Sequence, residues 1–113
     1  MNVRNKVTLI GHLGQDPELG STQSGDPYAR FSLATNESFR NREGDLVEKT
    51  EWHKCIVWGK KAETAKKFLT KGKEIALEGT LRYRSYEDRE GVRRYSTDIE
   101  VANFTMIGKK EPA

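Results

Sequence analysis

The sequence predicts an all-β domain that contains a single helix. Five segments alternate apolar and polar residues with a period of two, which is the pattern of a half-buried strand. One segment, KKAETAKKFLTKG, instead repeats its apolar residues at helical spacing. Glycine, proline, aspartate and asparagine separate the segments and favour turns. We therefore expect three strands, one helix and two strands, in that order.

The first two strands are expected at residues 3–13 and 28–37. The stretch between them, GQDPELGSTQSGDP, is rich in turn formers. The polar segment 38–49 carries Gly44 and Asp45 near its middle, which is typical of a turn. It is expected to form a long hairpin loop that leads into the third strand.

The third strand, TEWHKCIVW at residues 50–58, raises the question of which of its faces meets the core. Alternation places Trp52, Lys54 and Trp58 on one face. Cys55 and Val57 lie on the other. Because a lysine does not suit the interior of a small barrel, we expect the tryptophan face to be outside. The alternative is that both indoles are core residues and that Lys54 extends to the rim.

The helix is expected between Gly59, which ends the third strand, and Gly72, which has the position of a C-terminal stop. The fourth and fifth strands are expected at residues 73–87 and 94–108, joined by a tight turn around Gly91. A five-stranded antiparallel Greek-key barrel with one helix between strands three and four is the arrangement of the OB-fold, which binds oligonucleotides and oligosaccharides. The apolar face of the helix is predicted to consist of Ala62, Ala65, Phe68 and Leu69.

The composition is that of one small and highly charged domain. A chain of 113 residues is long enough for one compact core. Its hydrophobic fraction is 35% and its charged fraction is 33%, so the core must be thin. The net charge of +3 is unevenly distributed, with bases gathered in the helix and in LRYR and GVRRY. This balance is compatible with a polyanionic partner.

The single cysteine, Cys55, cannot form an internal disulfide, which fits a reducing compartment. The N-terminal stretch lacks the apolar run of a signal peptide, and no segment approaches the roughly 18 consecutive apolar residues of a membrane span. We expect a soluble intracellular protein.

Aromatic and basic residues interleave on several predicted elements, which points to a nucleic-acid ligand. In the fourth strand Arg82, Arg84 and Tyr86 share a face, with Leu81 and Tyr83 on the other. A flat aromatic ring that stacks on an unpaired base contributes roughly 1–3 kcal/mol, and cations bind the phosphates. A duplex hides its base faces, so exposed aromatics favour single strands. The candidate binding residues are Phe39, Trp52, Trp58 and Tyr86, followed by Lys54, Arg82 and Arg84; the helix lysines are interpreted as a solvated face.

Catalysis finds little support in the residues. His12 and His53 lie far apart, and no nucleophile triad, glycine-rich phosphate loop or metal-ligand spacing is visible. His53 is assigned a structural role at a strand or subunit contact. We expect no catalytic residues, no metal and no cofactor. Four carboxylates could serve a metal nuclease, but nothing in the sequence brings them together: Asp16, Glu18, Asp98 and Glu100.

The segments NKVTLIGHLGQDPEL, FSLATNESFR, TEWHKCIVWGKKAETAKKFLTKG and IALEGTLRYRSYED resemble the bacterial and mitochondrial single-stranded DNA-binding protein family. The resemblance covers roughly residues 3–107, and the combination of GxLGxDPE with TEWHxxxxWGKxAE is specific. It implies an OB-fold, usually a homotetramer, that coats exposed strands during replication, recombination and repair. The binding implied is without sequence preference and without a cofactor.

The resemblance also implies roles for individual residues. His53 would lie near a subunit contact, and the first strand would pair across a dimer. The aromatics at positions 39, 58 and 86 differ in kind from the commonest family choices, which is expected to tune stacking. Family positions that stack on bases match Phe39, Trp52, Trp58 and Tyr86, and family basic positions match Lys6, Lys54, Arg82 and Arg84.

The end of the chain departs from the family pattern. We expect an OB-fold domain at residues 1–108 and a short tail at 109–113 that lacks the acidic tip with which family members recruit partner enzymes. Such recruitment is therefore not expected of this polypeptide. The bacterial cytoplasm, in association with the nucleoid, is the expected location, with the mitochondrial matrix as the alternative.

Three other functions stay open at this stage. An OB-domain accessory of replication restart would bind DNA weakly and with strong salt dependence. An RNA-binding OB domain would read the ribose 2′-OH. A metal-dependent nuclease would degrade the strand that it binds.

Overall fold

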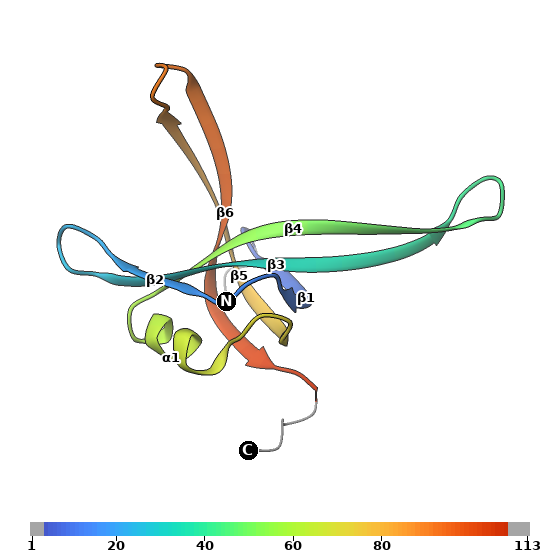
Figure 1. The fold of residues 1–113 in the computed structure, drawn as a ribbon, viewed down its shortest axis with the longest axis horizontal. Helices are drawn as coiled ribbons and strands as arrows, with labels where there is room; N and C mark the ends of the chain where they lie inside the picture. Colours follow the sequence, from blue (N-terminus) through green and yellow to red (C-terminus); the bar gives the residue numbers. More distant parts are fainter. Residues whose placement is uncertain (1–3, 109–113) are drawn as a thin grey trace.

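The computed structural model describes residues 4–108, which form a β-barrel with one helix and two long hairpins (Figure 1). The expected tail at 109–113 and residue 3 of the first expected strand lie outside this range. The elements are β1 (Val7–Leu13), β2 (Glu18–Ser21), β3 (Pro27–Arg40), β4 (Leu46–Trp58), α1 (Lys60–Phe68), β5 (Glu74–Glu87) and β6 (Arg93–Met106).

Five of the six strands close a barrel. The sheet order is β1-β5-β6-β4-β3-β2, and β1 closes the ring by pairing with β3 at His12–Ala34 and Leu13–Leu33. All pairs are antiparallel except β4 with β6, which is parallel and short. With its helix between the third and fourth barrel strands, this is the predicted OB-fold. The additional strand β2, which forms a small hairpin with β3, was not predicted.

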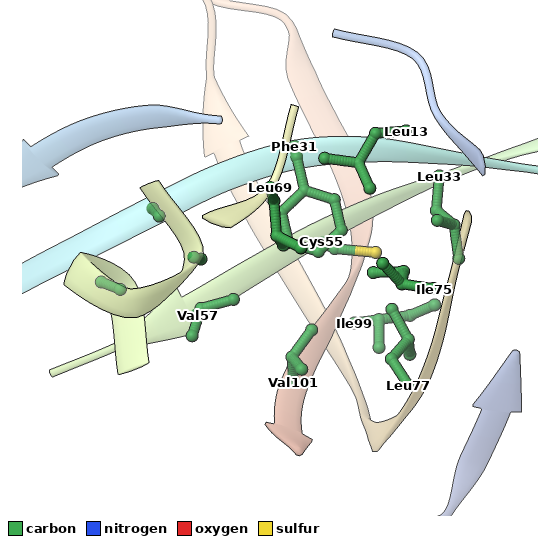
Figure 2. Close-up of a cluster of buried hydrophobic side chains, with 13 residues drawn as sticks. Leu13, Phe31, Leu33, Cys55, Val57, Leu69, Ile75, Leu77, Ile99 and Val101 are labelled. Carbon is green, nitrogen blue, oxygen red and sulfur yellow. The ribbon is translucent and has the colours of Figure 1, made fainter. Parts of the chain in front are cut away.

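The core lies inside the barrel and is closed on one side by the helix (Figure 2). Cys55 and Val57 of β4 point into it, as the alternation predicted. Burial of such side chains is the main favourable contribution to folding, at about 25 cal/mol for each Å² of apolar surface removed from water. Their neighbours in the core include Phe31, Leu33, Leu69, Ile75, Leu77, Ile99 and Val101.

The helix α1 begins after Gly59, whose φ of 73° lies in the left-handed region that glycine adopts most easily. It ends at Phe68, four residues before the expected stop at Gly72. The prediction that Phe68 belongs to the apolar face was wrong, because its ring is half exposed and lies 5.5 Å from the ammonium of Lys67. Leu69, in extended conformation just past the helix, takes the buried place instead. Within residues 4–108 no helix has the length and apolar character needed to cross a membrane.

Two hairpins project from the barrel in different directions, β3–β4 to the right in Figure 1 and β5–β6 upward. The predicted loop at residues 38–49 was wrong in extent, since only residues 41–45 are outside the strands. Both faces of this part of the hairpin are largely exposed and carry mostly polar residues, so the sequence shows no regular alternation there although the backbone ladder continues. The turn is held by the side chain of Asn41, whose Oδ1 accepts the N–H groups of Glu43 and Asp45.

Candidate nucleic-acid interface

The strand register divides the barrel and its hairpins into two faces, which we call the outer and the inner face. The inner face lines the core with Cys55 and Ile99. The outer face carries the predicted tryptophans on β4 and the predicted arginines on β5. Its candidate binding residues are Trp52, Lys54, Trp58, Arg82, Arg84 and Tyr86.

Trp52 is an exposed residue, with 62% of its surface open to solvent. The alternative that both indoles are core residues is therefore wrong, because Trp58 is also 40% exposed. The indole of Trp52 lies over Gly14, where a Cβ atom would overlap the six-membered ring. The backbone of Gly14 is fixed by a hydrogen bond from its N–H to the carbonyl of Ser32. Gly14 thus provides a flat support for the ring, a role that the sequence analysis did not identify.

Trp58 belongs to an aromatic cluster that the sequence analysis missed. Its ring meets that of Tyr28 edge to face, with centroids 5.4 Å apart, and the two residues are cross-strand partners. The guanidinium of Arg30 lies 5.1 Å from the Tyr28 ring. The alternation of YAR at the start of β3 was the available signal, since it places Tyr28 and Arg30 opposite the core residue Ala29.

A groove of ≈ 560 Å³ runs over the outer face, and we call it the outer groove. Ile56, which alternates onto the same face of β4 as the tryptophans, is buried and lies in the wall of this hollow. Lys54 and Tyr86 line it from the two hairpins. In the described part of the chain no carboxylate forms an ion pair with Lys54. The groove therefore offers a free cation beside aromatic and apolar surface.

The other predicted cations are paired with acids. Arg82 Nε lies 3.1 Å from Glu100, and Arg84 Nη2 lies 2.5 Å from Asp98. Asp98 is almost fully buried, and it also accepts a hydrogen bond from the hydroxyl of Ser96. Asp98 and Glu100, considered as nuclease carboxylates, thus serve as partners of arginines. In residues 4–108 no three His, Cys, Asp or Glu side chains are grouped so that they could hold a metal ion.

Lys6, just before β1, forms an ion pair of 3.2 Å with Glu78. Hydrogen bonds from Asn103 and Lys6, together with the charge of Lys6, lower the pKa of Glu78. Lys6 is half exposed and lies on the β1–β5 side of the barrel. It is not among the residues that line the outer groove.

Phe39 and His53 lie on the inner face, opposite to Trp52. Phe39 pairs with Val47 near the end of the β3–β4 hairpin and is about half exposed. His53 is partly buried, and its Nε2 lies 3.0 Å from the Thr35 hydroxyl. The register therefore separates Phe39 from the other three predicted aromatics.

The buried thiol of Cys55 is unreactive. Burial, and secondarily the negative charge of Asp98, raise the pKa of Cys55 to about 12. A thiol with this pKa is protonated at neutral pH and is a poor nucleophile. Cys55 acts as a core side chain and adds no reactive group to the outer groove.

Comparison with known proteins agrees with this geometry. The model of the single-strand binding protein family matches residues 4–107. The chain is 44% identical over 108 residues to single-stranded DNA-binding protein 1 of Chlorobaculum tepidum and 45% identical over 104 residues to the single-stranded DNA-binding protein of Xanthomonas campestris. These matches cover 95% and 92% of this chain, and 67% and 60% of the two relatives.

A solved structure, the Plasmodium falciparum SSB in complex with single-stranded DNA, superposes with a TM-score of 0.85 at 31% identity, covering 96% of this chain and 100% of that one. The family match spans nearly all of the described residues, and the fold agrees with it. The chain belongs to the single-strand binding protein family.

Proposed function

We propose that this protein binds single-stranded DNA on its outer face, with bases stacked on aromatic rings and phosphates bound by lysine and arginine. The observation that carries the proposal is the exposure of Trp52 and Trp58 on the same face as Lys54, which forms no ion pair within residues 4–108. Exposed indoles beside a free cation suit unpaired bases, which offer both a ring face and a phosphate. Family membership and the likeness to an SSB that binds single-stranded DNA support the same conclusion.

The individual roles follow from the geometry. Tyr86 in the wall of the outer groove, and Trp52 and Trp58 exposed on the same face, are proposed to stack on bases. Lys54 is proposed to bind a phosphate. Arg82 and Arg84 keep several N–H donors beside those used by their carboxylate partners, because a guanidinium has five. Both arginines are proposed to contact phosphates while they keep their ion pairs with Glu100 and Asp98. Lys6, on the β1–β5 side of the barrel, and Phe39, on the inner face, are proposed as contacts of a longer strand.

Binding without sequence preference follows from the same chemistry. Every base has a π-face that an indole can stack on, and phosphates are identical along a strand. We propose that the protein coats and protects exposed strands during replication, recombination and repair. This is the work of a binding protein rather than an enzyme.

The assembly is proposed to be a homotetramer built from dimers. β1 pairs with β5 along Val7–His12, but with β3 only at its last two residues. In the described chain the remaining edge of β1 is unpaired, and an open edge of this kind can pair with another copy. His53 is proposed to lie near a subunit contact. The two relatives compared by sequence are bacterial proteins, which supports the bacterial cytoplasm as the location.

The proposed function is tested by the intrinsic tryptophan fluorescence, titrated with oligo-dT, oligo-rU and a duplex of equal length at low and high salt. Stacking on Trp52 or Trp58 predicts strong quenching by oligo-dT that persists at high salt, with little response to duplex. Replacing either tryptophan with alanine is expected to weaken binding by about 1–3 kcal/mol without unfolding the barrel. Phe68→Ala, an exposed aromatic on the helix, is the matched control and is expected to leave binding unchanged.

Equal responses to duplex and single strand that disappear at high salt would contradict the proposal, because only phosphates would then be bound. In that case an accessory module is the better interpretation. A preference for oligo-rU would instead favour an RNA-binding domain.

A further inference from the structure

Two tyrosines on the β5–β6 hairpin are more exposed than any other large apolar or aromatic side chain of residues 4–108. Tyr83 is 75% and Tyr95 is 80% exposed. The sequence analysis placed Tyr83 opposite the arginine face and assigned it no role, and Tyr95 was not considered. Neither residue lies among those that line the outer groove. Exposed rings that lie next to one another form the kind of contiguous patch that marks an interaction site.

The register places both tyrosines on the inner face of the hairpin. Tyr83 pairs with Thr97 and Tyr95 pairs with Ser85, so the two rings are diagonal neighbours on one face. Arg93 lies on that face too, and its Nη1 is 3.4 Å from the Ser85 hydroxyl. In the described chain no carboxylate forms an ion pair with Arg93. The inner face of the hairpin therefore combines stacking surfaces with a free cation.

A notch borders both this surface and the outer groove. β4 and β6 pair only at Cys55–Ile99 and Ile56–Glu100, and beyond these pairs the two hairpins diverge (Figure 1). A hollow of ≈ 290 Å³ lies in this fork. It is lined by Trp52 and Lys54 from one hairpin, by Tyr95 and Ser96 from the other, and by Leu81 and Ile99. Lys54 and Ser96 also line the outer groove, so the two hollows share part of their walls.

We propose that a single-stranded nucleic acid passes from the outer groove through this notch onto the inner face of the β5–β6 hairpin. There its bases stack on Tyr95 and Tyr83 and a phosphate binds Arg93. Phe39 also lies on the inner face. A nucleic acid bound in the outer groove can contact Phe39 only if it passes from the outer to the inner face. This inference rests on the proposed function and extends it to a second surface.

The chemistry of the surface favours nucleic acid over a protein partner. Beyond Leu81 and Ile99, the inner face of the hairpin carries no aliphatic side chain. Tyrosine and arginine are enriched at protein interfaces too, but the cores of such interfaces are apolar and depleted of serine and glutamate. This surface instead alternates rings with hydroxyl and charged groups, as single-strand binding surfaces do. The residues in question are Tyr83, Ser85, Glu87, Arg93, Tyr95 and Thr97.

The test measures the affinity of a Tyr83→Ala/Tyr95→Ala double variant for oligo-dT of increasing length, from about 4 nucleotides to beyond the 16 that one OB-fold can occupy. The shortest oligomers, which fill the outer groove alone, are expected to bind as they do to the wild type. Long oligomers are expected to bind about 5- to 150-fold more weakly for each lost stacking contact. The Tyr83→Phe/Tyr95→Phe variant keeps the rings and is expected to restore long-strand binding.

The result separates this inference from the proposed function. If Trp52→Ala weakens binding at every length while the tyrosine variant follows the wild type throughout, the proposed function stands and the second surface is wrong. A change in subunit number by sedimentation in the tyrosine variant would also overturn it, because the face would then be a protein interface.

A second measurement uses the wild-type protein and so does not depend on the folding of a variant. Nitration of Tyr83 and Tyr95 by tetranitromethane is read by mass spectrometry. Long oligo-dT is expected to protect both tyrosines, and short oligo-dT is not. Equal nitration with and without the long strand would contradict the proposal.

Discussion

The indole of Trp52 rests on Gly14, and the two residues are so close that a methyl group on Gly14 would overlap the ring, with Cη2 at 3.0 Å and Cζ3 nearer still. The backbone of Gly14 is not in the left-handed region, so alanine is sterically acceptable to the chain itself. The overlap is with the far end of a side chain that can move. We therefore expect Gly14→Ala to displace the indole rather than to unfold the barrel.

The displacement predicts a specific phenotype. Gly14→Ala is expected to weaken oligo-dT binding by about 1–2 kcal/mol, part of what a stacked base contributes, with a shifted tryptophan emission spectrum. The check is a double-mutant cycle: in a Trp52→Ala background, Gly14→Ala should cause no further loss of affinity. Additive losses would show that Gly14 acts independently of the ring.

Arg84 is expected to contribute more to the free energy of unfolding than Arg82. Among the described residues, removing Arg84 leaves the buried carboxylate of Asp98 with the Ser96 hydroxyl as its remaining side-chain partner. Because an uncompensated buried carboxylate is costly, Arg84→Ala is expected to lower the free energy of unfolding by about 1–2 kcal/mol. Arg82→Ala breaks an exposed pair and is expected to cost at most about 1 kcal/mol. Urea denaturation measures both, and equal losses would contradict the distinction.

Cys55 is expected to resist thiol reagents in the folded protein. Its pKa is raised to about 12 by burial and by the charge of Asp98, so almost no thiolate is present at pH 8. Absorbance with Ellman's reagent should show no reaction in buffer and one thiol per chain in guanidinium chloride. Rapid labelling of the native protein at pH 8 would show that the barrel opens near Cys55.

The β5–β6 turn is expected to lose stability in acid. Asp88 accepts the N–H groups of Val92 and Glu90 and pairs with Arg94, and these interactions lower its pKa. Because the folded pKa lies below the unfolded one, the stabilisation is present above the unfolded pKa and is lost as the pH falls through the folded pKa. The difference in melting temperature between wild type and Asp88→Ala should therefore shrink as the pH is lowered below about 4.

A matched control for this pH dependence is available in the other hairpin. Asp45→Ala changes a turn in which the backbone N–H of the aspartate takes part in a hydrogen bond to Asn41. For Asp45→Ala, the difference in melting temperature from the wild type is expected to stay constant between neutral and acid pH. If the difference in melting temperature between the wild type and Asp88→Ala also stays constant, the electrostatic explanation is contradicted.

The stacking and the cation positions were predictable to different degrees. The outward direction of Trp52 and Trp58 follows from alternation with the core residues Cys55 and Val57, and the structure confirms it. The pairing of Arg84 with Asp98 was not predictable, because the two residues meet only through the register of β5 and β6. Their roles as DNA contacts remain predictions.

By itself the sequence determined the fold class, the single helix and the outward tryptophans, because period-two alternation and helical spacing are local properties of the chain. Only the tertiary structure decided the length of the β3–β4 hairpin, whose polar strands show no alternation, and the face on which Phe39 lies. It also brought Gly14 under Trp52 and opened a notch between Trp52 and Tyr95. These relationships join residues that are distant along the chain, and strand register and barrel closure, rather than local pattern, bring them together.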